Sequence, residues 1–188
     1  MNHDEPQRPA ATSPPAPALV RLLQLAYSAE RAAAFAYQGH ADSVSDPDVV
    51  ASLKQIEDDE WHHRACVLTI MNNLDVSPLL WFELKYFVIG QIIALSCYII
   101  GWFMPMYFAG RLESGNVNEY VELKRLLHAH GTNEYDAVVD QMTQVEKNHE
   151  VFFSEQITGH WMLPLFRPFF RWGPSHSFNE WPAHPIEE

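Results

Sequence analysis

Six side chains of the kind that binds transition metals recur in an ordered pattern along this chain. A single Glu is followed by a Glu-x-x-His pair, a second single Glu and a second Glu-x-x-His pair, and the six residues are Glu30, Glu60, His63, Glu113, Glu146 and His149. A three-residue spacing puts the carboxylate and the imidazole of each pair on one face of a helix, one turn apart. Four-helix bundles use this ligand set to hold two iron ions, so the pattern predicts a di-iron site.

The residue types in this pattern suit the chemistry of iron and oxygen. Carboxylates are hard donors that can bridge two metal ions, and each imidazole fixes a terminal position on one ion. We therefore predict two iron ions as the cofactor and O2 as a co-substrate, with two electrons supplied by a reductant and a pocket that excludes water. Asp59 or Glu150 could orient a ligand His through its other ring nitrogen.

Three positions in the pattern have alternative interpretations. Glu113 could instead be a solvated residue near a helix bend, and Glu30 could be an exposed acid paired with a neighbouring base. His62 is adjacent to His63, and a change of helical register would exchange the two. The spacing from Glu60 favours His63 as the ligand.

Helices must position these residues, and the spacing of apolar residues along the chain predicts four such helices. Apolar residues recur at helical intervals over 18–40, 47–73, 77–130 and 133–159, and each segment carries one part of the ligand pattern. Asp46-Pro47 is typical of a helix start, with Asp as the N-cap and Pro in the first turn. The sequence therefore predicts an all-α, ferritin-like four-helix bundle over residues 18–159.

The third segment contains an uncharged run from Tyr86 to Ala109 that is long enough to span a bilayer. A single transmembrane anchor is the alternative interpretation. We expect instead a long apolar bundle helix that partly faces a membrane, because Glu113 must lie at the same depth as the other ligands. Pro105 predicts a kink in this helix.

The two ends of the chain differ from the bundle in composition. Residues 1–17 are rich in Pro and lack an apolar run, which predicts a disordered tail and no signal peptide. Residues 160–188 form an aromatic extension whose Arg and Pro residues favour a surface-seeking segment over a regular helix. This extension could be a membrane-interface anchor, a strap packed on the bundle or a dimer contact. Cys66 and Cys97 are expected to be buried thiols in a reducing compartment.

Composition limits the size class and the partners of the chain. A chain of 188 residues with 47% hydrophobic residues is long and apolar enough to form one folded domain. Its formal charge of −12, with only 12 Lys and Arg, argues against a nucleic-acid partner. The same charge disfavours electrostatic attraction to anionic lipids, so any membrane contact would be hydrophobic.

Beyond the ligand pattern, the chain resembles the demethoxyubiquinone hydroxylases of ubiquinone biosynthesis, a family of the ferritin-like superfamily. The resemblance covers most of residues 20–155, and the segments that carry it are Glu30 to Gly39, Asp59-Glu60-x-x-His63, Val76-Ser77-Pro78 followed by Trp81, Glu113 with Tyr120, and Glu146-x-x-His149. It implies a di-iron monooxygenase that hydroxylates a lipophilic, polyprenyl quinol ring with O2. It also implies a homodimer bound peripherally at the cytoplasmic side of a bacterial-type inner membrane.

The resemblance suggests further roles for individual residues. Glu60 and Glu146 are expected to bridge the two iron ions. Tyr120, Tyr37 and Trp81 are candidates for lining the path of the substrate or of electrons, although aromatic residues at helical spacing more often pack in a core.

The chain also departs from the family pattern. It has Glu119 where the family usually has His, Val76 where the family has Arg, and His40 where the family has Gln. These changes leave the ligand pattern intact, and they leave the particular quinone and the electron donor undetermined.

Other functional classes share parts of the pattern. A bacterioferritin-like ferroxidase has the same ligands, but it would form a soluble cage with polar helix faces, and the apolar run argues against that arrangement. Another di-iron oxygenase that acts on a fatty aldehyde or a different lipid fits the apolar run equally well. The simplest alternative is a helical bundle that binds no iron.

Overall fold

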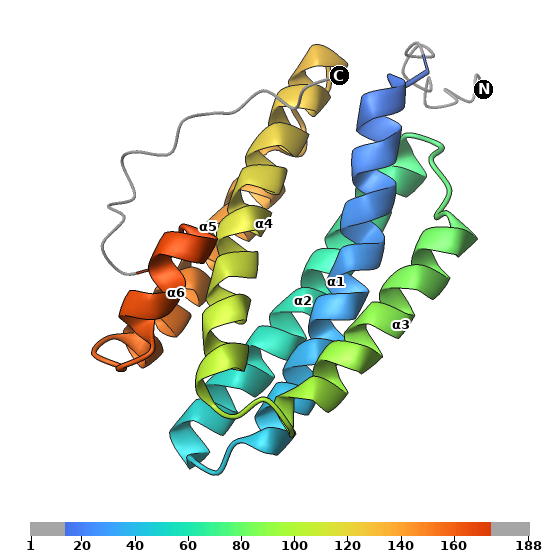
Figure 1. The fold of residues 1–188 in the computed structure, drawn as a ribbon. Coiled ribbons are helices and arrows are strands. Elements are labelled where there is room, and N and C mark those ends of the chain that lie inside the picture. The colour runs from blue at the N-terminus through green and yellow to red at the C-terminus, as the bar shows by residue number, and fades with distance from the viewer. Residues whose placement is uncertain (1–13, 174–188) are drawn as a thin grey trace, which may run out of the picture.

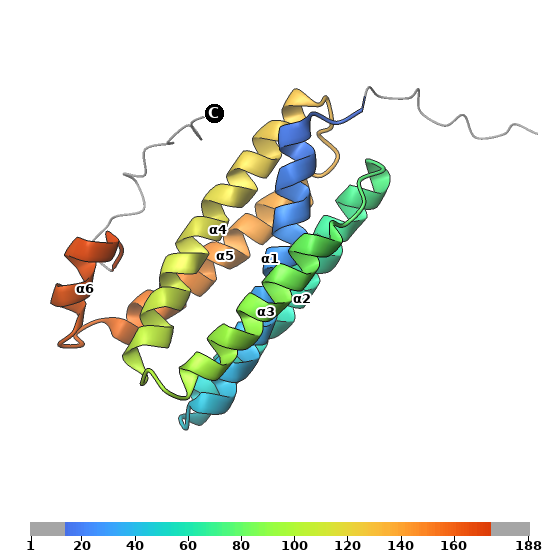
Figure 2. The same ribbon diagram turned by 45° about the vertical axis from the view of Figure 1, so that its right-hand side comes forward.

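The computed structural model describes residues 14–173, and over that range the protein is all-helical, as predicted. The six helices are α1 (Pro17–Ser43), α2 (Pro47–Asn73), α3 (Leu80–Cys97), α4 (Phe103–Ala129), α5 (Asp136–Ile157) and α6 (Leu163–Phe170). Helices α1 to α5 run alongside one another, and the short α6 lies beside the end of the bundle where α5 finishes (Figures 1 and 2). Residues 1–13 of the expected tail and residues 174–188 of the expected extension lie outside the described range.

The helices pack as two antiparallel pairs with one helix added on the outside. Helix α1 packs along α2, helix α4 packs along α5, and fewer contacts join α1 to α4 and α2 to α5. Helix α3 packs along α1 (Figure 1). The four helices that carry the predicted ligands, α1, α2, α4 and α5, therefore surround one interior.

The third helical segment differs from its prediction. In place of one long kinked helix, the chain forms α3 and α4, which residues 98–102 connect. Gly101 has a φ of 79°, in the left-handed region that favours glycine, and the chain reverses there. Pro105 lies in the first turn of α4, where amides have no helical partner and a missing N–H costs little. The uncharged run is thus divided between two helices, and α3 leads back along the bundle to the start of α4 (Figure 2).

Helix α3 exposes much of its apolar surface. Among the described residues, Leu80–Cys97 is the one helix long and apolar enough to cross a membrane by length and composition, with a mean hydropathy of 1.4, and it is only 11% buried. Glu83 holds its first turn to the bundle. The Glu83 carboxylate accepts from Ser28 at 2.7 Å, from Arg31 at 3.2 Å and from Arg64 at 2.6 Å.

Residues 160–173 contain a helix that the sequence did not predict. Helix α6 has Pro164 in its first turn and Pro168 inside it. This segment packs on the bundle as a strap, which is one of the three expected arrangements. The Tyr107 hydroxyl donates to the Trp172 carbonyl at 2.8 Å, and Trp172 Nε1 donates to Glu150 at 2.7 Å.

The interior has two apolar clusters with a polar layer between them. One cluster includes Leu23 of α1 and Val67 of α2, and the other includes Leu53 of α2 and Phe153 of α5. On each of the four ligand-bearing helices, the predicted ligands lie between residues of the two clusters. The packing of both clusters therefore fixes the height of the polar layer in the bundle.

Two local predictions can be compared directly with the structure. The Asp46 carboxylate accepts hydrogen bonds from the amides of Asp48 and Val49, which confirms it as the N-cap of α2. Both cysteines are free thiols; Cys97 is buried as expected, whereas Cys66 is half-buried.

Candidate metal centre

All six predicted ligands lie in the polar layer, and each is buried. Their ligand atoms form two groups within which the atoms lie no more than 4.8 Å apart. One group is Glu30, Glu60, His63 and Glu146, and the other is Glu60, Glu113, Glu146 and His149. Glu60 and Glu146 belong to both groups, which is the arrangement expected of carboxylates that lie between two metal ions.

The structure distinguishes between the alternatives at three positions. Glu113 is 0% exposed and Glu30 is 4% exposed, so neither is a solvated surface residue. The Tyr120 hydroxyl donates a hydrogen bond to Glu30. His63 is buried while His62 is exposed, which agrees with the spacing from Glu60.

Both ligand imidazoles direct Nδ1 toward the shared carboxylates. His63 Nδ1 lies 2.9 Å from Glu146 Oε1 and 4.0 Å from Glu60 Oε2. His149 Nδ1 lies 3.6 Å from Glu60 Oε1 and 3.7 Å from Glu146 Oε2. The other nitrogen of His149, Nε2, is 3.1 Å from Asp59 Oδ2, so Asp59 orients this ring.

Asn116 hydrogen-bonds to the predicted ligands, and the sequence pattern did not identify it. Its Nδ2 group donates to Glu113 Oε2 at 3.0 Å and to Glu146 Oε2 at 3.4 Å. Asn116 lies one helical turn after Glu113, so the same spacing rule that paired the Glu and His residues could have found it. Glu150, the other acid considered for orienting a His, instead accepts the Trp172 hydrogen bond.

Burial dominates the protonation of three of the four acids. It raises the pKa of Glu30, Glu60 and Glu113, and repulsion from Glu146 adds to the effect at each. Burial acts in the same direction on Glu146, but contacts with Glu113, His149 and His63 outweigh it and lower the pKa of Glu146. Four carboxylates this close together cannot all ionise unless cations offset their charge.

The unpaired atoms of the site fit a metal-binding role. Several buried polar atoms make no hydrogen bond of acceptable geometry among the described residues, and those in this layer are Glu60 Oε1 and Oε2, His63 Nδ1, Glu113 Oε1, Glu146 Oε1 and His149 Nδ1. His63 Nδ1 and Glu146 Oε1 lie 2.9 Å apart but are not aligned as donor and acceptor. An unpaired buried polar atom costs about 1–3 kcal/mol, so a cluster of them requires an explanation. The two groups of carboxylates and imidazoles could each hold a metal ion, and such an ion would give these atoms a partner.

Two neighbouring cavities lie beside this layer. A cavity of about 470 Å³ lies between α1, α3 and α4, and its wall is mainly Ala, Ile and aromatic side chains, including Tyr37. A smaller cavity is lined by Glu30, Glu119 and Tyr120, and both cavities share Ala29, Ala33 and Leu112. Burial, together with the charges of Glu30 and Glu146, raises the pKa of Glu119 to about 7.

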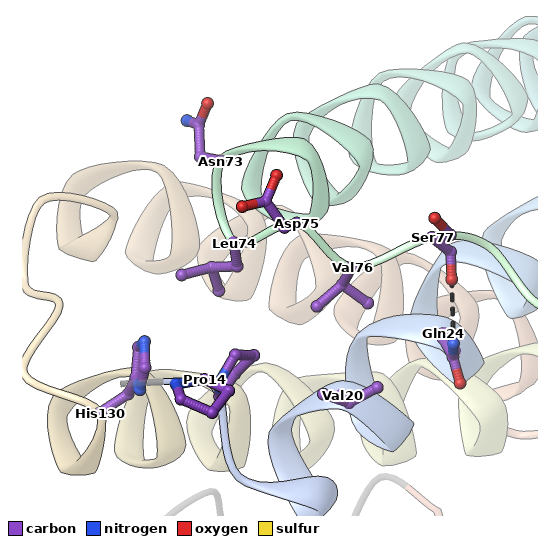
Figure 3. Close-up of a pocket in the computed structure, with 10 residues that line it drawn as sticks. Pro14, Val20, Gln24, Asn73, Leu74, Asp75, Val76, Ser77 and His130 are labelled. Carbon is purple, nitrogen blue, oxygen red and sulfur yellow. Dashed lines mark hydrogen bonds between the residues drawn. The ribbon is translucent and has the colours of Figure 1, made fainter. Parts of the chain in front are cut away.

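Trp81 and a third cavity lie away from the polar layer. Trp81 is 65% exposed on α3 and lines neither of the two neighbouring cavities. A separate cavity of about 640 Å³ lies where α1 begins and α2 and α4 end, and Gln24 donates to the Ser77 carbonyl at 2.9 Å in its wall (Figure 3). It contains none of the six predicted ligands.

Comparison of the chain with protein-family models, with curated proteins and with solved structures finds no match. The buried Glu and His groups described above, and the cavities beside them, are therefore the basis for assigning a function.

Proposed function

We propose that this protein is a di-iron monooxygenase of ferritin-like fold that uses O2 and two electrons to hydroxylate a lipophilic quinol ring. The observation that carries the proposal is the pair of buried ligand groups that share Glu60 and Glu146 beside an apolar cavity. Two antiparallel helix pairs joined by one long connection, which is α3 here, are typical of ferritin-like di-iron proteins.

Each residue of the site has a definite role in this proposal. Glu30 and His63 would hold one iron, Glu113 and His149 would hold the other, and the two shared carboxylates would bridge them. The bound iron pair supplies the binding and two-electron activation of O2. Asp59 would keep the proton of His149 on Nε2, which would leave the Nδ1 lone pair free to bind a metal ion. Asn116 and Tyr120 hold the carboxylates of the centre in fixed orientations.

The surrounding residues prepare the site for an apolar substrate. The mainly apolar wall of the cavity suits an apolar substrate, and a bound substrate would displace water from the approach to the site. Glu119 lies in the smaller cavity beside Glu30, where burial raises the pKa of its carboxyl, and it is the candidate group for accepting or releasing a proton beside the site. The apolar wall on the side of Glu30 favours an oxygenase over a ferroxidase, which needs no room for an organic substrate.

The exposed apolar face of α3 supports peripheral contact with a membrane. The resemblance described above is the sole basis for placing that contact at the cytoplasmic side of a bacterial-type inner membrane. Because α3 packs along α1, a bilayer that α3 spanned would also enclose the charged residues of α1. Contact through one face avoids that cost and gives a lipid substrate a short route to the cavity. Membrane fractionation tests the location. Sedimentation tests the expected homodimer, and a cage-sized particle would contradict it.

The first experiment compares the iron content of the wild type with that of a Glu60→Ala, Glu146→Ala double variant, both produced with excess iron. A Glu155→Ala variant is the matched control, because Glu155 is an exposed acid on the same helix as Glu146. Two irons per chain in the wild type and the control, but not in the double variant, support the metal centre.

The iron-loaded wild type is then given reductant, O2 and a short-tailed demethoxyubiquinol analogue, and the product is analysed by mass spectrometry. Gain of one oxygen atom on the ring supports the hydroxylase. An unchanged analogue would refute the quinol assignment, and absence of iron from the wild type would refute the di-iron centre.

A further inference from the structure

The apolar cavity is lined by two polar side chains that have no role in the proposal above. Tyr37 and His40 lie one turn apart on α1, and both line the cavity between α1, α3 and α4. Tyr37 Oη and His40 Nε2 are buried, and neither has a hydrogen-bond partner among the described residues. Because such atoms are costly to leave unpaired, the pair points to a partner that comes from outside the chain.

Phe153 holds both rings in place. The Tyr37 ring stacks on it with centroids 5.7 Å apart and an interplanar angle of 16°, and the His40 ring stacks at 6.2 Å and 9°. Phe153 itself is fully buried in the core. Two rings fixed against the same aromatic side chain lose little further freedom when a ligand binds, so the pair is preorganised.

The other groups in the wall of this cavity are neutral. No Lys, Arg, Asp or Glu in the described part of the chain lines it. Of the remaining polar residues, the Ser96 hydroxyl and the Cys97 thiol both donate to the Ile93 carbonyl, and Tyr86 contributes a further neutral hydroxyl. Burial lowers the pKa of His40 to about 4, so its ring is neutral at neutral pH.

A neutral wall of this kind selects among oxygen-bearing ligands. A hydroxyl or carbonyl group can pair with Tyr37 and His40 without carrying charge into the cavity. A carboxylate would lose its hydration and would meet no counter-charge, which is a large cost in apolar surroundings. The cavity volume of about 470 Å³ is in the range that holds one small ligand.

We propose that this cavity binds a lipophilic ring that carries a neutral hydroxyl or carbonyl oxygen, and that Tyr37 and His40 hydrogen-bond to that oxygen. Ala29, Ala33 and Leu112 belong both to this cavity and to the one that contains Glu30, so the bound ring lies on the approach to the candidate metal centre. The inference rests on the proposed function only in treating the ring as a substrate, since binding itself requires no metal.

The test uses metal-free full-length protein and three probes with the same ring and tail: 4-heptylphenol, heptylbenzene and 4-heptylbenzoate. Their affinities at neutral pH are measured by displacement of an apolar fluorescent dye. The phenol is expected to bind about tenfold tighter than either of the others, as one or two buried hydrogen bonds would provide. Tyr37→Phe and His40→Leu should each weaken phenol binding about fivefold and leave heptylbenzene binding unchanged. Tyr98→Phe is the matched control, because it removes the same hydroxyl from an exposed tyrosine that does not line this cavity, and it should have no effect.

Equal affinity for the three probes, tighter binding of the benzoate, or unaltered phenol binding in both variants would overturn the inference. Tyr37→Phe removes a single oxygen atom, so it remains informative even if His40→Leu does not fold. The two proposals fail separately. If the protein holds two irons and hydroxylates a quinol but does not select among the probes, only the ring-binding inference is overturned. If the protein binds the phenol selectively but takes up no iron, the ring-binding inference is supported and the di-iron function is overturned.

Discussion

The neutral ring of His40 makes a specific contribution to the pH dependence of stability. Burial lowers its pKa from 6.5 to about 4 in the folded protein, where the residue is 3% exposed. In the unfolded chain the pKa keeps its ordinary value, so below pH 6.5 the unfolded state takes up a proton that the folded state does not. The stability that His40 contributes is therefore fully present above pH 6.5 and is lost as the pH falls toward about 4.

The size of this effect follows from the two pKa values. Their difference corresponds to about 3.4 kcal/mol when both states have titrated. At about pH 5 the folded ring is still mostly neutral, and the loss relative to about pH 8 is about 2 kcal/mol. In a chain of 188 residues this corresponds to a decrease of about 4 to 8 °C in Tm. Tyr86 and Cys97, which also line the cavity, have raised pKa values and stay neutral over this range.

Urea unfolding of metal-free wild type and of His40→Gln, each at about pH 8 and about pH 5, measures this contribution. Glutamine has a similar volume and takes up no proton. The buried carboxylates titrate in both proteins, so their contribution cancels when the two pH dependences are subtracted. The wild type should lose about 2 kcal/mol more than the variant on acidification. If the two proteins lose the same free energy, His40 is not held neutral by burial and the reasoning is wrong.

Three further predictions concern the metal centre and the packing of α3. In chelator at about pH 8, Glu60→Gln should raise the Tm of the metal-free protein, because it removes an acid whose raised pKa makes folding less favourable as the pH increases; a lower Tm would contradict this. Asp59→Asn should weaken metal binding about 10- to 100-fold, because His149 loses its orienting partner, and a titration with Co2+ monitored by its visible absorbance would reveal an unchanged affinity. Gly90→Ala should destabilise the protein by about 1–3 kcal/mol in urea unfolding, because the added Cβ would lie 2.8 Å from a backbone oxygen of α1. Gly115→Ala is its control, since nothing lies within 4 Å of the added Cβ, and it should instead stabilise by about 0.5–1 kcal/mol.

Four of the six predicted ligands, the two Glu-x-x-His pairs, could be found in the sequence because their spacing depends only on helix geometry. An acid and an imidazole three residues apart share a face of any helix, and an acid among Ala and Leu, such as Glu30, indicates burial. The division of the third segment could not be predicted in the same way. The composition of an uncharged run is the same whether it folds as one helix or as two. The left-handed conformation of Gly101, where the chain reverses, depends on the packing around it.

Residues that act across helices were also difficult to predict. Trp81 was a candidate from its family position alone, and no spacing rule places it on the outer face of α3. Tyr37 and His40 share a helix face in the sequence, but their missing hydrogen-bond partners become visible only when α3, α4 and α5 enclose them.

The position of α3 has a consequence for how this protein can diverge. Helix α3 contributes none of the six predicted ligands, yet its side chains form one wall of the apolar cavity. Mutations at wall positions such as Ile89 and Ile93 can alter the shape of the cavity without disturbing the four helices that carry the acids. Selection can therefore change which ligand fits the cavity while the candidate metal centre is preserved, and related chains are expected to vary most in α3.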